Sequence, residues 1–365
     1  MKRLVFSFTL CMLCIMAYAD DIAMIGGIRY YLFKGEATVM KQETKLSGKV
    51  VIPEYISYNG KSYRVTSLDA KAFASQDITS IVIPNSVEEL GDESFQYCMK
   101  LSSVTLSSNL KIIGSSCFFS CSKLTSIKLP NSIQELKKSC FAGSGLTTIS
   151  IPSSVTTFGE DLFSACSDLT SAYLPNNITE LPAGLFSFCG KLLYVKIPSS
   201  VKVIGGRCFQ VCTSISQVTL PSSIQKIGGS SFEGLNNLKY VDIPGSVTSL
   251  GYYCFGGCKN LIKITCHWLN PEKVDLPTAA FPYIYSNAKI YVPVGTKSKY
   301  QKLYAFRDFQ IIEDASVSGV TVNSVTTGTT SVTTTSETSN VIDNTIQKAS
   351  KVKNTYKKVK SLFGF

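Results

Sequence analysis

The sequence predicts a β-rich solenoid, in which a parallel sheet is built from about nine rungs of 23 residues and is capped at both ends. Residues 67–266 return to nearly the same wording about every 23 residues, and self-similarity at such a period is typical of stacked repeats. Prolines mark the period, 22 or 23 residues apart, at Pro130, Pro152, Pro175, Pro198, Pro221 and Pro244. Phenylalanines mark it again, at Phe73, Phe95, Phe118, Phe141, Phe163, Phe186, Phe209, Phe232 and Phe255.

Each repeat has the pattern expected of one rung. Apolar residues two apart, such as Val195 and Ile197, predict a short strand with one buried face. The proline that follows has no N–H for a ladder and therefore ends the strand. The segment from phenylalanine to cysteine, as in residues 95–98, has room for a single helical turn. A lone repeat buries too little apolar surface to offset the entropy of ordering it, so the rungs must stabilise one another by stacking.

The repeat string C-x-x-L-x-x-I-x-[IL]-P-x-S-[VI] resembles the BspA-like leucine-rich repeat family of secreted and surface proteins, over residues 67–266. The wording YVPVGTKSKYQKLYAFRDFQIIED is similar to the closing segment of exported Bacteroides-type repeat proteins. The resemblance implies a leucine-rich repeat solenoid. It also implies a role in adhesion to host extracellular proteins or in attachment between cells.

The first 19 residues have the pattern of a secretory signal peptide. Lys2 and Arg3 precede a largely apolar stretch over residues 4–16, and Ala17 and Ala19 form an A-x-A cleavage site. Cleavage is expected after Ala19. Since no other apolar run approaches the length of a membrane-spanning helix, the sequence predicts a secreted or cell-surface protein.

Both ends of the repeat array are predicted to be capped. Residues 20–66 are interpreted as an N-terminal cap with a hairpin, because the strand-like runs IRYYLF and ATVMK flank Lys34-Gly35-Glu36. Asn59-Gly60 signals a second tight turn in this cap. Residues 267–315 are interpreted as a C-terminal cap, beginning at the only histidine and the only tryptophan, His267 and Trp268.

Two further segments follow the predicted cap. Residues 316–340 are rich in Thr, Ser and Val and are predicted to be a flexible linker. Residues 341–365 are predicted to form a basic amphipathic helix, a pattern typical of segments that bind membrane surfaces or polyanions. A solvated tail and a coiled-coil partner helix are the alternatives. The surface-binding lysines would be Lys348, Lys351, Lys353, Lys357, Lys358 and Lys360.

The sequence contains no recognisable catalytic constellation. A single histidine excludes the two-histidine zinc motif, and phosphate-binding, nucleophile-elbow and EF-hand motifs are not found. No enzymatic activity, cofactor, metal site or nucleic-acid partner is expected. Cysteines form two columns that alternate with Leu and Ser, which favours a small buried packing position; disulfides and a metal site are the alternatives. The columns are Cys98, Cys121, Cys166, Cys189, Cys212 and Cys258, and Cys117, Cys140, Cys208 and Cys254.

The outward face of the predicted sheet is the candidate binding surface. Early rungs carry small hydroxyl side chains there, whereas later rungs add tyrosine and charge. Tyrosine combines apolar area with a polar tip, which suits recognition. The candidate residues are Tyr173, Tyr194, Lys196, Tyr240, Asp242 and Lys263. We expect a protein partner; a carbohydrate ligand, an enzyme site around His267 and an ordinary solvated sheet face are the alternatives.

Overall fold

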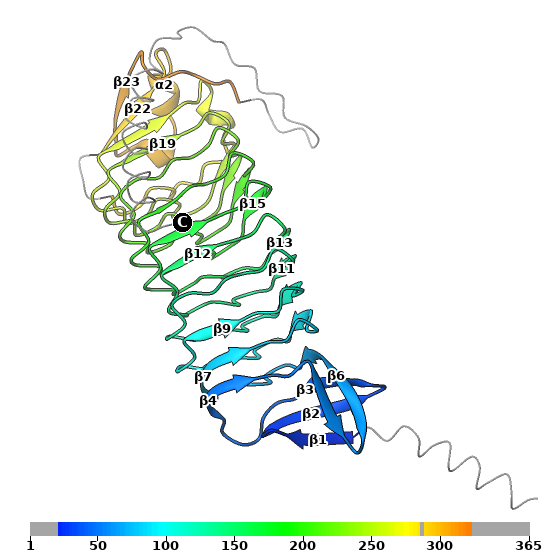
Figure 1. The fold of residues 1–365 in the computed structure, drawn as a ribbon. Helices are drawn as coiled ribbons and strands as arrows, with labels where there is room; N and C mark the ends of the chain where they lie inside the picture. The colour runs from blue at the N-terminus through cyan, green and yellow to red at the C-terminus, as the bar shows by residue number, and fades with distance from the viewer. Residues whose placement is uncertain (1–20, 285–287, 323–365) are drawn as a thin grey trace, which may run out of the picture. The chain divides into compact units, whose positions relative to one another are not determined.

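The computed structural model describes residues 21–284 and 288–322. The predicted signal peptide at 1–19 and the predicted basic helix at 341–365, with its six lysines, lie outside the described residues, as does the linker from residue 323 onward. Within the described part, the chain forms the predicted solenoid, and Figure 1 shows its rungs following one another in chain order.

The strands after the leucine column form one side of the solenoid, here called the long-strand face. Its neighbours pair in parallel, as in Ile149↔Ala172 between consecutive rungs. Residues 126–129 and 217–220 are not strands, and they divide this face into three sheets. The strands are β4 (Ser47–Val51), β7 (Asp77–Val82), β9 (Ser103–Thr105), β12 (Thr148–Ser150), β14 (Ser171–Tyr173), β16 (Tyr194–Val195), β19 (Tyr240–Ile243), β21 (Lys263–Cys266), β22 (Lys289–Val292) and β23 (Gln310–Glu313).

A second parallel ladder, here called the short-strand face, is formed by the second apolar pair of each repeat. Its two-residue strands place one side chain in the core, as Leu136 and Ile204 do, except that Phe158 in β13 is only half-buried. The sequence predicted a single sheet, and the structure has this second ladder as well. The strands are β8 (Glu89–Leu90), β10 (Ile112–Ile113), β11 (Glu135–Leu136), β13 (Thr157–Phe158), β15 (Glu180–Leu181), β17 (Val203–Ile204), β18 (Lys226–Ile227) and β20 (Ser249–Leu250).

The phenylalanine column forms a continuous stack inside the solenoid. Consecutive ring centroids from Phe73 to Phe281 lie 5.1–5.8 Å apart. This spacing is in the range of favourable offset aromatic pairs. Because each ring contacts its own copy in the next rung, one residue type repeated at one position builds a large part of the core.

The segment from phenylalanine to cysteine is a run of turns rather than the predicted helical turn. In one rung the amides of Asp161, Phe163 and Ala165 donate to carbonyl oxygens of the next rung, 2.7–3.0 Å away. Asp161 and Ala165 have φ angles of 55° and 57°. Left-handed residues at both positions keep the alternate amides aimed along the stack, while the amides of Ser164 and Cys166 donate within the rung to Asp161 and Phe163.

Both hairpins expected in the N-terminal region are present. β2 and β3 pair antiparallel across Lys34 and Gly35, and β5 and β6 pair antiparallel across Asn59 and Gly60. An additional strand, β1, precedes β2 and forms an edge of the same sheet. The strands are β1 (Asp21–Ile25), β2 (Ile28–Phe33), β3 (Glu36–Val39), β5 (Tyr55–Tyr58) and β6 (Lys61–Leu68).

The rungs continue into the region predicted as a C-terminal cap. β22 and β23 extend the long-strand face in parallel register, and Phe281 extends the phenylalanine stack. The solenoid therefore has about 11 turns rather than about nine. Insertions between these last strands hid the period from the sequence. They contain short helices η2 (Pro271–Lys273), α2 (Lys297–Tyr300) and η3 (Tyr304–Phe306).

Residues 316–322, here called the strap, return to the solenoid instead of beginning a flexible linker. Leu269 donates its amide to Val320, and the Asn270 side chain exchanges two hydrogen bonds of 2.8 Å with the backbone of Val322. A Cβ at Gly319 would lie 2.2 Å from the Leu269 side chain. The linker prediction is wrong for these residues, because polar backbone contacts hold a segment whose composition suggested no core.

Candidate functional site

The three candidate tyrosines lie on the outer surface of the long-strand face. Tyr173, Tyr194 and Tyr240 are 53%, 48% and 57% exposed, respectively. The buried neighbours Ala172, Val195 and Val241 alternate with them along the strands, so the alternation of the pleat turns each ring outward.

The strand register brings part of the candidate set together. Ser171 pairs with Tyr194 and Ala172 with Val195, so the next position along sets Lys196 beside Tyr173. Tyr240 stands apart, because residues 217–220 occupy the rung between β16 and β19. The compact part of the surface is therefore formed by two rungs.

Leu193 belongs to this surface and was missed from the sequence. It is 60% exposed and directly precedes Tyr194. The corresponding position is Thr147 or Thr170 in the two preceding rungs. A leucine that replaces threonine at an exposed position is a departure from the repeat, and that departure was the available signal.

The remaining two candidate residues are engaged within the protein. Lys263 is half-buried, and its Nζ lies 4.1 Å from the centre of the Tyr291 ring on the next strand, a cation–π geometry. Asp242 accepts a 2.7 Å hydrogen bond from His267 Nε2. A ligand would have to compete with these contacts, so we do not place either residue at the centre of the surface.

His267 connects the long-strand face to the strap. Its Nε2 faces Asp242, and its Nδ1 lies 2.6 Å from the carbonyl oxygen of Ser318. Both neighbours are acceptors, so both hydrogen bonds form together only when the ring is an imidazolium. Burial lowers the pKa of His267. The hydrogen bond to Asp242, the charge of Asp242 and the Ser318 carbonyl raise the pKa by more than burial lowers it, so the pKa lies above its ordinary value.

This geometry gives His267 a structural role. The Ser318 hydroxyl is 3.3 Å from Nδ1, but the carbonyl of the same residue is closer to that nitrogen. A general base that activates a hydroxyl needs a ring nitrogen free to accept its proton. The arrangement thus favours a clamp on the strap over the catalytic alternative around His267.

The eleven cysteines of the described residues are free and buried, as the packing interpretation predicts. In six rungs the thiol donates to the carbonyl oxygen of the preceding rung's phenylalanine, as Cys189 does to Phe163 at 3.0 Å. Burial raises the pKa of Cys98 to about 11 and that of Cys212 to about 12, which keeps them protonated and unreactive. Among the described residues, no three His, Cys, Asp or Glu side chains converge as metal ligands.

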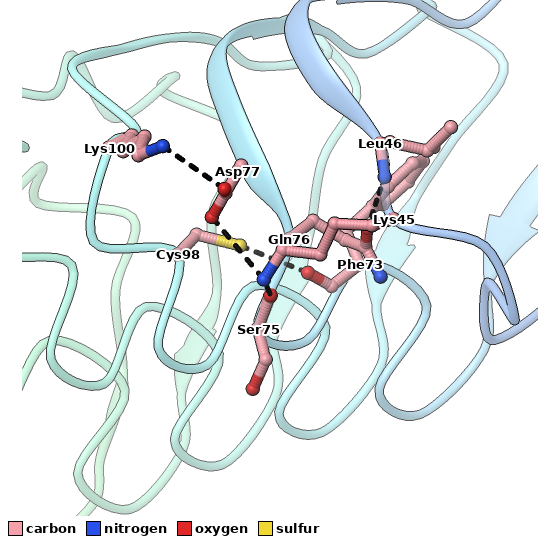
Figure 2. Close-up of polar contacts among 8 residues, drawn as sticks. All are labelled: Lys45, Leu46, Phe73, Ser75, Gln76, Asp77, Cys98 and Lys100. Carbon is pink, nitrogen blue, oxygen red and sulfur yellow. Dashed lines mark hydrogen bonds and ion pairs between the residues drawn. The ribbon is translucent and has the colours of Figure 1, made fainter.

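The first repeat replaces the cysteine with Gln76, which joins the array to the N-terminal region (Figure 2). Gln76 Oε1 accepts the amide of Leu46 at 2.6 Å. Asp77 is bridged by Lys100 and Lys45, which lower its pKa. These contacts anchor the first rung and contain no group suited to a reaction.

Two clefts lie away from the tyrosine-bearing surface. One, of about 860 Å³, is near the last turns and is lined by Phe281, Tyr304 and Arg307 among others. A second, of about 570 Å³, lies beside the short-strand face. Neither is lined by His267 or by a candidate tyrosine, and the three candidate tyrosines are each about half exposed.

Comparison with known proteins assigns the repeats. The chain matches the BspA type leucine-rich repeat region over residues 66–192 and 179–312. A leucine-rich repeat protein from Bacteroides ovatus ATCC 8483 has a similar structure, with a TM-score of 0.68 and 29% identity, over 84% of this chain and 78% of that one. A search of curated proteins gave no match.

A more distant structure shares the fold alone. The pneumococcal vaccine antigen PcpA has a TM-score of 0.50 and 18% identity to this chain, over 82% of this chain and 100% of that one. Across the residues that the structure describes, no helix has the length and apolar character needed to cross a membrane. With most of its length covered by the family's repeats, the chain belongs to the BspA-type leucine-rich repeat family.

Proposed function

We propose that this protein is exported to the cell surface or secreted, and that it binds a protein partner through the long-strand face. The centre of the binding surface is the group formed by Tyr173, Leu193, Tyr194 and Lys196, with Tyr240 beyond it. The observation that carries the proposal is the exposure of Tyr173, Leu193 and Tyr194, each about half exposed or more, on two adjacent rungs; Tyr240 is exposed further along the same face. Membership of a family of surface-type proteins supports it.

The chemistry of the surface favours a macromolecule. Tyrosine and leucine supply apolar area that protein partners can cover, and tyrosine is enriched among residues that dominate binding energy. The surface is an outward sheet rather than a concave cleft, whereas small-molecule sites are usually concave. Host extracellular proteins or proteins of other cells are the partners we propose; a glycan is the alternative, since a ring beside Lys196 also suits sugars.

A four-residue variant tests this proposal. Replacement of Tyr173, Tyr194, Lys196 and Tyr240 by Ser should abolish binding to immobilised extracellular-matrix proteins and leave the thermal transition in place. The matched control removes as many exposed side chains of the same types elsewhere, through Tyr252→Ser, Tyr283→Ser, Tyr304→Ser and Lys259→Ser. Unchanged affinity in the first variant would move the site off this face. Binding to a glycan array but to no protein would favour the carbohydrate alternative.

Export and the tail are proposed on the sequence alone. Cleavage after Ala19 should leave a secreted chain with Asp20 at its N-terminus, which N-terminal sequencing measures. Residues 341–365 are proposed to bind anionic membrane surfaces, since each lysine near such a surface contributes on the order of 1 kcal/mol at low salt. Removal of residues 341–365 should abolish salt-sensitive sedimentation with anionic vesicles. Equal sedimentation with neutral vesicles would contradict the membrane proposal.

A further inference from the structure

The strand β1 leaves one edge of the N-terminal sheet open. Among the described residues β1 pairs with β2 alone, and it stands at the end of its nine-stranded sheet. Gly26 and Gly27 connect the two strands with positive φ angles of 58° and 77°, as in a two-residue type I′ hairpin. In such a hairpin the residues flanking the turn, Ile25 and Ile28, form a hydrogen-bonded pair.

The alternation of an antiparallel ladder then fixes which groups point outward. Counting from the Ile25↔Ile28 pair, Ala23 and Asp21 direct their backbone groups toward β2, and Ile22 and Met24 direct theirs away from it. The bonds of β2 agree with this count, because Arg29, opposite Met24, uses its amide and carbonyl for Gln42 and Met40 instead. The open edge therefore presents the N–H and C=O of Ile22 and Met24.

The same two residues also present apolar side chains. Ile22 is 52% exposed and Met24 is 55% exposed, whereas Ala23 between them is buried. Backbone donors, backbone acceptors and apolar area thus coincide on one short edge. An edge of this kind is a template for pairing with another strand unless the sequence protects it.

At this end of the solenoid β4 and β5 also have one paired edge each, and β4, which pairs with β7, provides a comparison. β4 has a register shift between Gly48 and Lys49 where it meets β7, and Gly48 has a φ of 74°. A bulge and a lysine are both devices that discourage edge pairing. β1, with the sequence DIAMI, has neither a bulge, a proline nor a basic residue.

We propose that β1 pairs with β1 of a second copy of this chain, antiparallel and symmetric about Ala23. This register places Ile22 opposite Met24 of the second copy, and Met24 opposite its Ile22. Each of the two pairs exchanges both backbone hydrogen bonds, and their apolar side chains meet on one face of the joined sheet. The contact uses the same patch on both copies, so it closes as a two-fold dimer. It is independent of the function proposed above.

The register can be tested by disulfide formation between singly substituted chains. In the proposed pairing, residue 22 of one copy and residue 24 of the other have Cα atoms about 5.5 Å apart, inside the range a disulfide tolerates. Two copies of residue 22 would be about 8 Å apart, from the strand rise and spacing, and outside it. A mixture of Ile22→Cys and Met24→Cys chains, both with Cys11 and Cys14 also replaced by Ser, should therefore cross-link under mild oxidation, while each variant alone should not. The native cysteines of the described region are buried, so we do not expect them to cross-link under these conditions.

Cross-linking within either single variant, or none in the mixture, would overturn the proposal. Sedimentation of uncross-linked protein gives an independent measurement. Met24→Lys should weaken self-association by about tenfold or more, because it sets charges against an apolar neighbour across the dimer axis. Val51→Lys is the matched control, since Val51 is 53% exposed on the β4 edge. Equal weakening by both variants, or an unmodified protein that stays monomeric, would also contradict the β1 dimer.

Discussion

The middle of the solenoid and its ends satisfy their buried groups by different means. In the middle, the same contacts recur from rung to rung: phenylalanine packs on phenylalanine, and the cysteine thiol donates to the carbonyl oxygen of the preceding rung's phenylalanine. At the ends, single residues do this work, with Gln76 at the first rung and Trp268, Asn270 and Tyr300 near the last. In the middle, one residue type at the same position of every repeat satisfies every rung. An end has no further rung to contact, so it needs side chains that do not occur at that position in the other repeats.

The largest expected effect concerns the cysteines in the middle of the solenoid. If the middle is held by packing alone, all thiols of the described residues should be unreactive toward a thiol reagent in the native protein. All of them should react after denaturation without a reductant, because burial keeps each one protonated until the fold opens. Thiol counting in the two states measures this. A denatured count well below the number of free cysteines would mean that disulfides staple the rungs.

Large-to-small substitutions in the middle and at the C-terminal end should each reduce hydrogen-exchange protection mainly near the substituted residue. Phe163→Ala and Trp268→Ala each remove a fully buried ring and should each cost about 3–5 kcal/mol. Trp268 also donates its indole N–H to Val247 at 2.8 Å. Because repeats couple mainly to their neighbours, hydrogen exchange should increase around β21–β23 for Trp268→Ala and on both sides of β13–β14 for Phe163→Ala. Uniform loss of protection in both variants would contradict this difference.

At the C-terminal end, the side chain of Asn270 holds the strap. Asn270→Ala removes both hydrogen bonds to Val322 and leaves its buried amide and carbonyl unpaired. We expect a loss of about 1–3 kcal/mol in the free energy of unfolding, measured by urea denaturation. Asn260→Ala is the control, because Asn260 is exposed and makes a single bond to Asn236. A similar loss in both variants would mean that the strap is not a structural element.

The clamp at His267 predicts that the C-terminal end is sensitive to pH. The folded-state pKa is raised above 6.5, so the imidazolium contributes stability that is fully present below pH 6.5 and is lost as the pH rises through the folded pKa. The thermal midpoint should therefore fall across this window in the unmodified protein and fall less in His267→Gln and in Asp242→Asn. A thermal midpoint that changes identically with pH in all three proteins would contradict the proposed role of His267 in stability.

The smallest expected effect has the opposite sign and concerns the middle. Val211 is β-branched yet has a φ of 58° because the repeat requires a left-handed residue there. Val211→Gly should relieve strain and raise stability by roughly 0.5–1 kcal/mol, after the added flexibility of the unfolded chain is deducted. Val218→Gly, at a partly buried position without positive φ, should destabilise instead. Destabilisation by both would mean that the ladder between rungs does not strain Val211.

The periodic part of the molecule could be predicted because residues that recur at the same position of each repeat contact one another in neighbouring rungs. Phe163 and Leu169 recur in register, and so do the strand pairs, since each side chain packs against its own equivalent in the next rung. The hairpins at Gly35 and Gly60 were also predictable, because the turn itself restricts the residues it accepts. The prediction of a helical turn was wrong because the neighbouring rungs impose a left-handed conformation on non-glycine residues such as Ala165. The identity of such a residue does not indicate this conformation.

The candidate surface was predicted in part, for a related reason. Outward positions follow from alternation along a strand, and Tyr173, Tyr194 and Tyr240 are indeed outward and exposed. The engagement of Lys263 by Tyr291 could not be predicted, because the partner lies beyond an irregular insertion. Whether these tyrosines bind a partner stays a prediction.

The solenoid, its period, its core columns and the face that carries the tyrosines could be predicted from the sequence, because they depend on local propensity and on contacts that repeat every rung. The tertiary structure alone decided that β22 and β23 continue the ladder, that His267 holds Asp242 and Ser318 together, and that the strap returns to Asn270. The contacts of His267 and Asn270 join residues 25 to 52 positions apart, and each occurs once. A contact made once leaves no pattern in a chain, so only the folded arrangement can reveal it.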